Sequence, residues 1–146
     1  MKRLLFQNIF ILLLVTISKA QLKVANYSLG KFGTDKYEHF EFWTKDGKST
    51  TISYAYGKGP KEVKLRFLGK DQINGDSCLK VEFSNEYVLY IIPNKLRLEI
   101  TDSSGDYHKI FEWEYEGPVN GIGTYCDFCT EDEEEAMQLI HLAYLK

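Results

Sequence analysis

Two closely spaced cysteines late in the chain are the residues with the clearest chemical potential. Cys126 and Cys129 have C-x-x-C spacing, and an acidic segment typical of a helix start follows them. A thiol at a helix N-terminus has a lowered pKa, which is the physical basis of thiol–disulfide exchange. In an oxidising compartment the same pair forms a structural disulfide. We predict this structural bridge, which leaves Cys78 unpaired.

A metal site built on the cysteine pair is a third interpretation. Zinc takes four nitrogen or sulfur ligands, often with this cysteine spacing, so Cys78 and a histidine would have to complete the set. A histidine directly after the second cysteine would indicate haem attachment, but that position is Thr130. The chain has three histidines, at His39, His108 and His141. None of them lies at the short spacing from another that paired metal ligands have. The sequence therefore predicts neither a metal nor a cofactor.

A row of alternating glutamates offers a further interpretation. Glu112, Glu114 and Glu116 share one face of a predicted strand, where paired carboxylates could perform glycosidic acid–base chemistry. The alternative is a solvated strand face opposite an apolar one, and this is the interpretation we favour. We find no nucleophile–base motif such as G-x-S-x-G or H-E-x-x-H. We therefore expect a binding protein rather than an enzyme.

An aromatic group near the start of the second predicted strand is the candidate binding surface. Tyr37, His39 and Trp43 share one side of this strand, and Phe40 and Phe42 occupy the other. Most aromatic residues of a β-rich domain belong to the core or to cross-strand pairs. These three combine rings with polar edges, so we expect them to line a ligand pocket or a protein-binding patch.

Period-two alternation between turn signals predicts a mainly β fold. Seven or eight strands are expected, over 22–29, 37–43, 50–56, 62–68, 78–83, 87–92, 96–100 and 107–115. Short connections favour antiparallel neighbours, and hence a β-meander that forms a barrel or half-barrel. We expect a buried core that includes Leu65, Phe67, Leu79, Val81, Tyr87, Leu89, Leu96, Leu98 and Ile140.

The period changes near the end of the chain, where one amphipathic helix is expected over about 130–145. Thr130 followed by Glu133 is a capping-box signature, and the acidic first turn suits the helix dipole. An apolar stripe of helical period follows. The strand over 87–92 is apolar on both faces, so we expect the helix to dock there.

A strand meander with one C-terminal helix resembles small exported β-barrels of the lipocalin type. The resemblance is one of architecture, and it implies a closed or nearly closed barrel. The G-x-W motif that lipocalins carry near the first strand does not occur in this chain. No functional residue is therefore transferred from that family.

The beginning of the chain has the pattern of a secretory signal peptide over residues 1–20. Lys2 and Arg3 precede an apolar stretch, and Ser18 and Ala20 place small residues where a signal peptidase reads them. The apolar stretch is shorter than the roughly 20 residues of a spanning helix. We expect cleavage, export to the periplasm or secretion, and no membrane span afterwards.

Residues 21–146 have the length of one domain. They hold 15 of the 18 basic residues and all 21 acidic ones, which gives a formal charge of −6. This balance argues against nucleic acid, which requires a basic patch. Asn26-Tyr27-Ser28 is a glycosylation sequon, and the sequence does not decide whether it is used.

Three hypotheses of function remain open. The leading one is an exported, non-catalytic β-domain that binds a small apolar ligand inside a barrel or a protein partner on its surface. The second is a thiol–disulfide redox protein that uses Cys126 and Cys129. The third is a structural or accessory domain without a ligand. A cavity with convergent polar groups would favour the first hypothesis.

Overall fold

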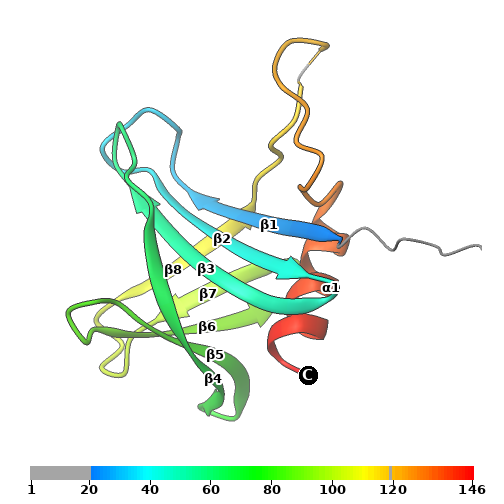
Figure 1. Ribbon diagram of the computed structural model, residues 1–146. Helices are drawn as coiled ribbons and strands as arrows, with labels where there is room; N and C mark the ends of the chain where they lie inside the picture. The colour runs from blue at the N-terminus through cyan, green and yellow to red at the C-terminus, as the bar shows by residue number, and fades with distance from the viewer. Residues whose placement is uncertain (1–20, 119) are drawn as a thin grey trace, which may run out of the picture.

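The computed structural model describes residues 21–118 and 120–146 and shows a closed eight-stranded antiparallel barrel followed by a helix (Figure 1). Each strand pairs with the next, and β8 pairs with β1 to close the barrel. The predicted β-meander with a C-terminal helix is confirmed, and it forms a complete barrel. The predicted signal peptide lies outside the described residues. The elements are β1 Leu22–Leu29, β2 Glu38–Lys45, β3 Lys48–Tyr56, β4 Val63–Ile73, β5 Asp76–Glu82, β6 Val88–Asn94, β7 Arg97–Thr101, β8 His108–Trp113 and α1 Glu133–Tyr144.

Tight turns that we predicted from glycine set the register of the β2–β3 and β4–β5 hairpins. Between β2 and β3, Asp46 and Gly47 have φ values of 52° and 73°, and Asn74 and Gly75 between β4 and β5 have 51° and 89°. Two consecutive positive φ values twist a hairpin in the same sense as its strands. Glycine adopts such values without steric cost, which explains the local sequence at both turns.

One apolar cluster fills the barrel interior. Inward-facing side chains alternate with outward-facing ones along each strand. On β2, for example, Phe40 faces inward and contacts Tyr54 of the neighbouring strand β3. Tyr87 was wrongly predicted to be buried. It precedes β6, is 41% exposed and donates its hydroxyl hydrogen to Asp102. The buried interior side chains are Ala25, Tyr27, Phe40, Phe42, Ile52, Leu65, Leu79, Val81, Leu89, Ile91, Leu98, Ile100 and Phe111.

The helix begins two residues later than the capping-box pattern predicted, since that pattern makes Thr130 the N-cap. Asp132 is the N-cap, and its side chain accepts a hydrogen bond from the backbone amide of Glu135. Thr130 lies outside the helix because its backbone amide donates to the carbonyl of Val24 on β1. A capping box would pair this amide with the side chain of Glu133. Because the amide is bonded to β1 instead, Thr130 does not cap the helix, and the helix starts only after the chain leaves β1.

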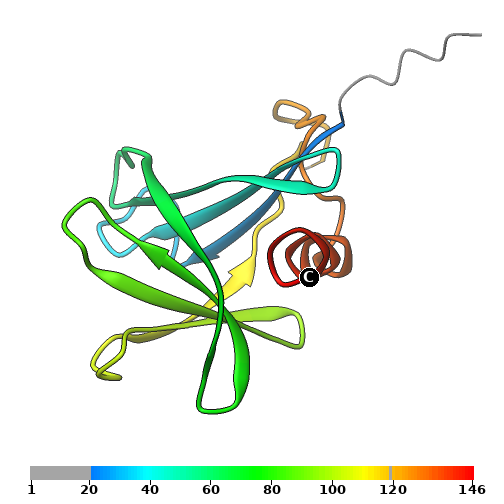
Figure 2. The same cartoon turned by 60° about the horizontal axis from the view of Figure 1, so that its bottom comes forward.

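The helix packs across one end of the barrel and not on the face of β6, where we had expected it (Figure 1, Figure 2). Its main contacts are with β1, β2 and β3. The hydroxyl of Tyr144 donates to the backbone carbonyls of Trp43 and Thr51 at that end. The apolar stripe of the helix completes the core through Ala136, Met137, Ile140 and Tyr144.

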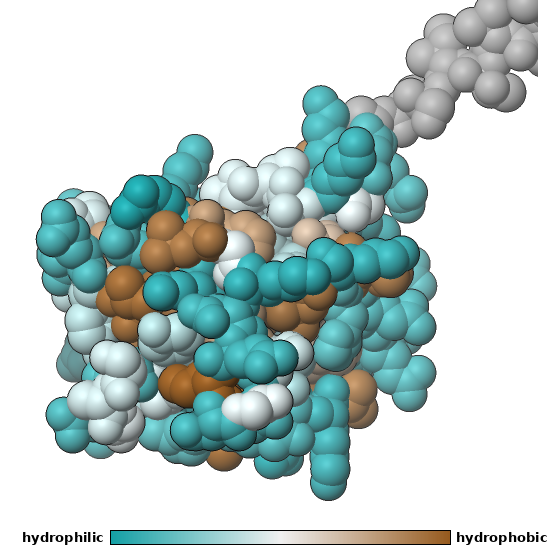
Figure 3. Space-filling view, turned by 90° about the horizontal axis from the view of Figure 1, so that it is seen from below, coloured by the Kyte–Doolittle hydropathy of each residue, from teal (hydrophilic) through white to brown (hydrophobic). Residues whose placement is uncertain are grey.

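Polar side chains separate the apolar ones on the face of the molecule shown in Figure 3, where the apolar patches are small. Within the described residues, no helix has the length and apolar character needed to cross a membrane.

Candidate functional site

The candidate site lies on the outer face of β2, where three predicted surface residues share one side. Tyr37 and His39 line a pocket of about 200 Å³ together with Glu41 and Phe32. Trp43 does not line this pocket. Its indole nitrogen donates to Glu41 at 2.8 Å, so the indole positions a carboxylate of the site.

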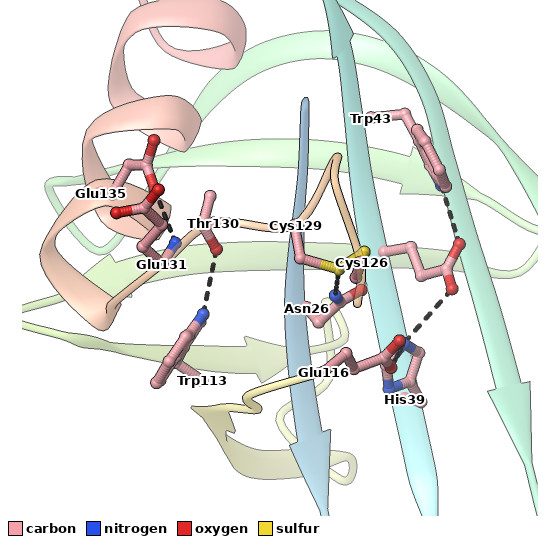
Figure 4. Close-up of a disulfide and its surroundings, with 11 residues drawn as sticks. Asn26, His39, Trp43, Trp113, Glu116, Cys126, Cys129, Thr130, Glu131 and Glu135 are labelled. Carbon is pink, nitrogen blue, oxygen red and sulfur yellow. Dashed lines mark hydrogen bonds and ion pairs between the residues drawn. A yellow bond between two sulfur atoms is a disulfide. The ribbon is translucent and has the colours of Figure 1, made fainter. Parts of the chain in front are cut away.

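Two glutamates in the segment that follows β8, Glu114 and Glu116, complete the site. After β8 ends, the backbone amide of Glu114 donates to the carbonyl of Asn26 at 2.9 Å, which extends the chain along β1. Glu114 and Glu116 thereby reach across β1 toward His39, and Figure 4 shows Glu116 beside the imidazole. The predicted solvated face holds for Glu112 and Glu116, whose side chains are 67% and 44% exposed. It is wrong for Glu114, which is half-buried.

His39 is the centre of this cluster and is only 6% exposed. Its Nδ1 lies 3.1 Å from Glu114 and 2.9 Å from the hydroxyl of Tyr37, which itself donates to Glu114 at 2.7 Å. Its Nε2 faces Glu41 at 3.5 Å and Glu116 at 3.6 Å. The imidazole thus has carboxylates on both nitrogens.

The carboxylates change the protonation of the histidine. Burial lowers the pKa of His39, but hydrogen bonds and ion pairs with Glu114, Glu41 and Glu116 outweigh it and raise the pKa to about 9. His39 therefore carries a positive charge at neutral pH.

The three carboxylates differ in how firmly they are ionised. His39 and the hydrogen bond from Trp43 lower the pKa of Glu41 despite its burial. Burial opposes ionisation of Glu114, but contacts with His39 and Tyr37 still lower its pKa. Burial, together with the charges of Glu41 and Glu114, raises the pKa of Glu116.

A second polar cluster lies inside the barrel, at the end away from α1. Glu38 of β2 points inward and pairs with Lys109 of β8. The same carboxylate accepts hydrogen bonds from the hydroxyls of Tyr54 at 3.0 Å and Tyr107 at 2.9 Å. In this cluster one acid pairs with one base, and both tyrosine hydroxyls have a hydrogen-bond acceptor.

A larger pocket of about 600 Å³ lies between the β6–β7 hairpin, β8 and the start of α1. Most of its charged side chains are exposed, and Arg97 pairs with Glu112 at 3.1 Å. These charges compensate one another, and neither side chain is buried. The pocket at His39 is smaller, but its polar groups converge, so we regard it as the better candidate.

The predicted disulfide is confirmed, since Cys126 and Cys129 are bonded and Cys78 is a buried free thiol. Cys129 pairs with Val24 of β1, and its sulfur accepts a hydrogen bond from Asn26 at 3.4 Å (Figure 4). The pair thus precedes the helix and is not at its N-terminus. The dipole effect fades within the first turn of a helix, so it does not favour a reactive thiolate here.

The sequon residue Asn26 is buried under this bridge, at 2% exposure. Its amide nitrogen, which would carry a glycan, is the donor to the sulfur of Cys129. A glycan on that nitrogen is incompatible with this packing, which answers a question that the sequence left open.

Comparisons with known proteins give no further assignment. No protein family model, curated protein sequence or solved structure matches this chain. The function is therefore argued from the site alone.

Proposed function

We propose that this protein is an exported, non-catalytic binding domain that captures a positively charged group in the pocket around His39. The barrel supplies a rigid wall, and the pocket lies on its outside. Convergent polar groups in a concave site with aromatic edges are typical of a ligand site. Export rests on the signal-peptide pattern of the first twenty residues.

The observation that carries this proposal is an excess of negative charge in a half-buried site. In the part of the chain that the structure describes, the ion pairs of Glu41, Glu114 and Glu116 are all with His39. One positive charge therefore faces three carboxylates. Partial burial reduces solvent screening and strengthens the field that these groups create. Such a site favours a cation over a neutral or anionic ligand.

The other hypotheses have weaker support from the geometry. Large side chains of the core cluster occupy the barrel interior, including Phe40, Phe42 and Phe111, which argues against an apolar ligand there. The cysteine pair is not at the helix N-terminus, so the redox hypothesis loses its physical basis. The third hypothesis, a structural domain without a ligand, does not explain why more carboxylates than positive charges gather at the pocket.

A titration followed by NMR tests this function. Butylammonium and zinc chloride are the cationic probes, and butyrate is the anionic control of similar size to butylammonium. We expect at least one cation to shift the imidazole resonances of His39, and butyrate to leave them in place.

Two variants locate the binding. Glu116→Gln should weaken cation binding, while Glu112→Gln, which removes an exposed carboxylate outside the pocket, should not. Failure of both cations to bind would contradict the proposal, as would equal binding in the two variants.

A further inference from the structure

We propose that Nε2 of His39 and the carboxylates of Glu116 and Glu41 bind a divalent transition-metal ion, with Glu114 on the opposite nitrogen of the imidazole. This inference rests on the proposed function, because it specifies which cation the pocket captures. One nitrogen of His39 and one oxygen from each of Glu114 and Glu116 lie within 4.8 Å of one another. They come from β2 and from the segment that follows β8, so the closure of the barrel brings them together.

The distances suit ligands that surround one ion. Metal–nitrogen and metal–oxygen bonds of about 2.0–2.2 Å place neighbouring ligand atoms about 3 to 3.5 Å apart. Glu41 and Glu116 lie 3.5 and 3.6 Å from Nε2 of His39, which is long for a hydrogen bond. Small rotations of these side chains would bring their oxygens to an ion at Nε2.

The histidine is the buried member of this group. More than nine-tenths of His39 is buried, and it lines the pocket. Its contacts with Tyr37 and Glu114 are at Nδ1. Nε2 faces the carboxylates of Glu41 and Glu116, and an ion bound between them would take the place of the Nε2 proton.

The second nitrogen has the support that metal-binding histidines usually have. A ligating imidazole commonly donates its other N–H to a carboxylate, which fixes the ring and its tautomer. Glu114 lies 3.1 Å from Nδ1, and Tyr37 donates to the same oxygen at 2.7 Å. Trp43 and Ser53 likewise donate to Glu41, at 2.8 and 3.2 Å. The site is thus held in place before any ion arrives.

The donor set selects the class of metal. Calcium and magnesium prefer sites made of oxygen ligands, whereas an imidazole suits zinc and the neighbouring transition metals. One imidazole with two or three carboxylates therefore favours an ion such as Zn²⁺ over Mg²⁺. As the metal–nitrogen bond forms, the proton that Nε2 held is released to solvent.

Isothermal titration calorimetry of the tag-free chain from Gln21 with zinc chloride tests this inference, with magnesium chloride as the control ion. We expect one zinc ion per chain and no comparable heat with magnesium. Glu116→Gln should weaken zinc binding about tenfold or more, and His39→Gln should weaken it further. NMR of the imidazole nitrogens should identify His39 as the ligand.

His108→Gln is the matched control, because His108 is an exposed histidine that also faces a glutamate, Glu99, at 3.6 Å. It should leave the zinc affinity unchanged. Zinc binding that is lost in His108→Gln but retained in Glu116→Gln would overturn the inference. Since His39→Gln could impair folding, Glu116→Gln is the variant that decides.

The zinc and butylammonium results separate the two proposals. Zinc binding that depends on Glu116 supports both of them. If butylammonium binds at His39 and zinc does not, the metal inference is wrong and the proposed function stands. If neither cation binds, both proposals are wrong.

Discussion

The two polar clusters on opposite faces of β2 use similar groups but balance their charges differently. On the inner face, Glu38 meets Lys109 and accepts hydrogen bonds from Tyr54 and Tyr107. On the outer face, His39 meets three carboxylates. Glu38 and His39 are consecutive residues of β2. They belong to different clusters because successive side chains of a strand point to opposite faces.

This difference separates a structural cluster from a binding one. A buried pair that is fully compensated has no demand for a further ligand, and removal of one partner leaves an uncompensated charge. A cluster with surplus carboxylates gains from a cation. We therefore expect changes to the inner cluster to affect folding, and changes to the outer cluster to affect binding.

The largest effect on stability is expected for Glu38→Leu. This change leaves Lys109 and two tyrosine hydroxyls without their acceptor. Breaking a buried pair costs about 3–5 kcal/mol, and because about a third of Lys109 is exposed we expect about 2–3 kcal/mol. Urea denaturation measures this. Arg97→Ala, which breaks an exposed pair with Glu112, is the control and should cost under about 1 kcal/mol. Equal costs would remove the distinction between buried and exposed pairs.

A smaller, pH-dependent effect is expected for His39→Gln in metal-free protein. The folded pKa of His39 is raised to about 9 from 6.5. The stability that the imidazolium adds is therefore fully present below pH 6.5 and is lost as the pH rises through 9. We expect the variant to be less stable by about 2 kcal/mol at pH 6, and this difference to shrink by pH 10. Denaturation at both pH values checks it, and a constant difference would show that His39 is not charged in the fold.

The disulfide should contribute less than either cluster. Only two residues separate Cys126 from Cys129, so the bridge constrains the unfolded chain little. The double Cys→Ser variant should lose about 1 kcal/mol, as measured by urea denaturation. A reduction potential below about −300 mV would mark a structural bridge. A potential of about −120 to −200 mV would instead revive the redox hypothesis.

Local sequence signals predicted the parts of this fold that depend on neighbours along the chain. Alternation and turn signals predicted seven or eight strands, and the structure has eight. Glycine predicted tight turns at Gly47 and Gly75. The same alternation placed Tyr37 and His39 on one outer face. The capping pattern at Thr130 misled because pairing with Val24 takes that backbone amide, and no local pattern reveals a partner about a hundred residues away.

The rest of the site depends on barrel closure. Glu114 and Glu116 alternate with apolar residues, as solvated strand residues do, and we interpreted them in that way. They face His39 because β1 lies between β2 and the end of β8. The hairpin order of a meander does not show whether the sheet closes. The sequence signal for these residues was the alternation of Glu112, Glu114 and Glu116, which does not show which strand lies beside them.

The smallest effect on stability is expected for Glu116→Gln. Burial and neighbouring carboxylates raise the pKa of Glu116, so its ionised form is disfavoured in the folded protein. Replacing it by a neutral amide removes this penalty, and it also removes an ion pair with His39 that is 3.6 Å long and partly exposed. Because the two effects oppose each other, the free energy of unfolding should change by less than about 0.5 kcal/mol. Denaturation and cation titration on the same sample give both quantities. If the variant loses stability as Glu38→Leu does but still binds cations, the outer cluster is a structural element, and the contrast between the two faces of β2 does not hold.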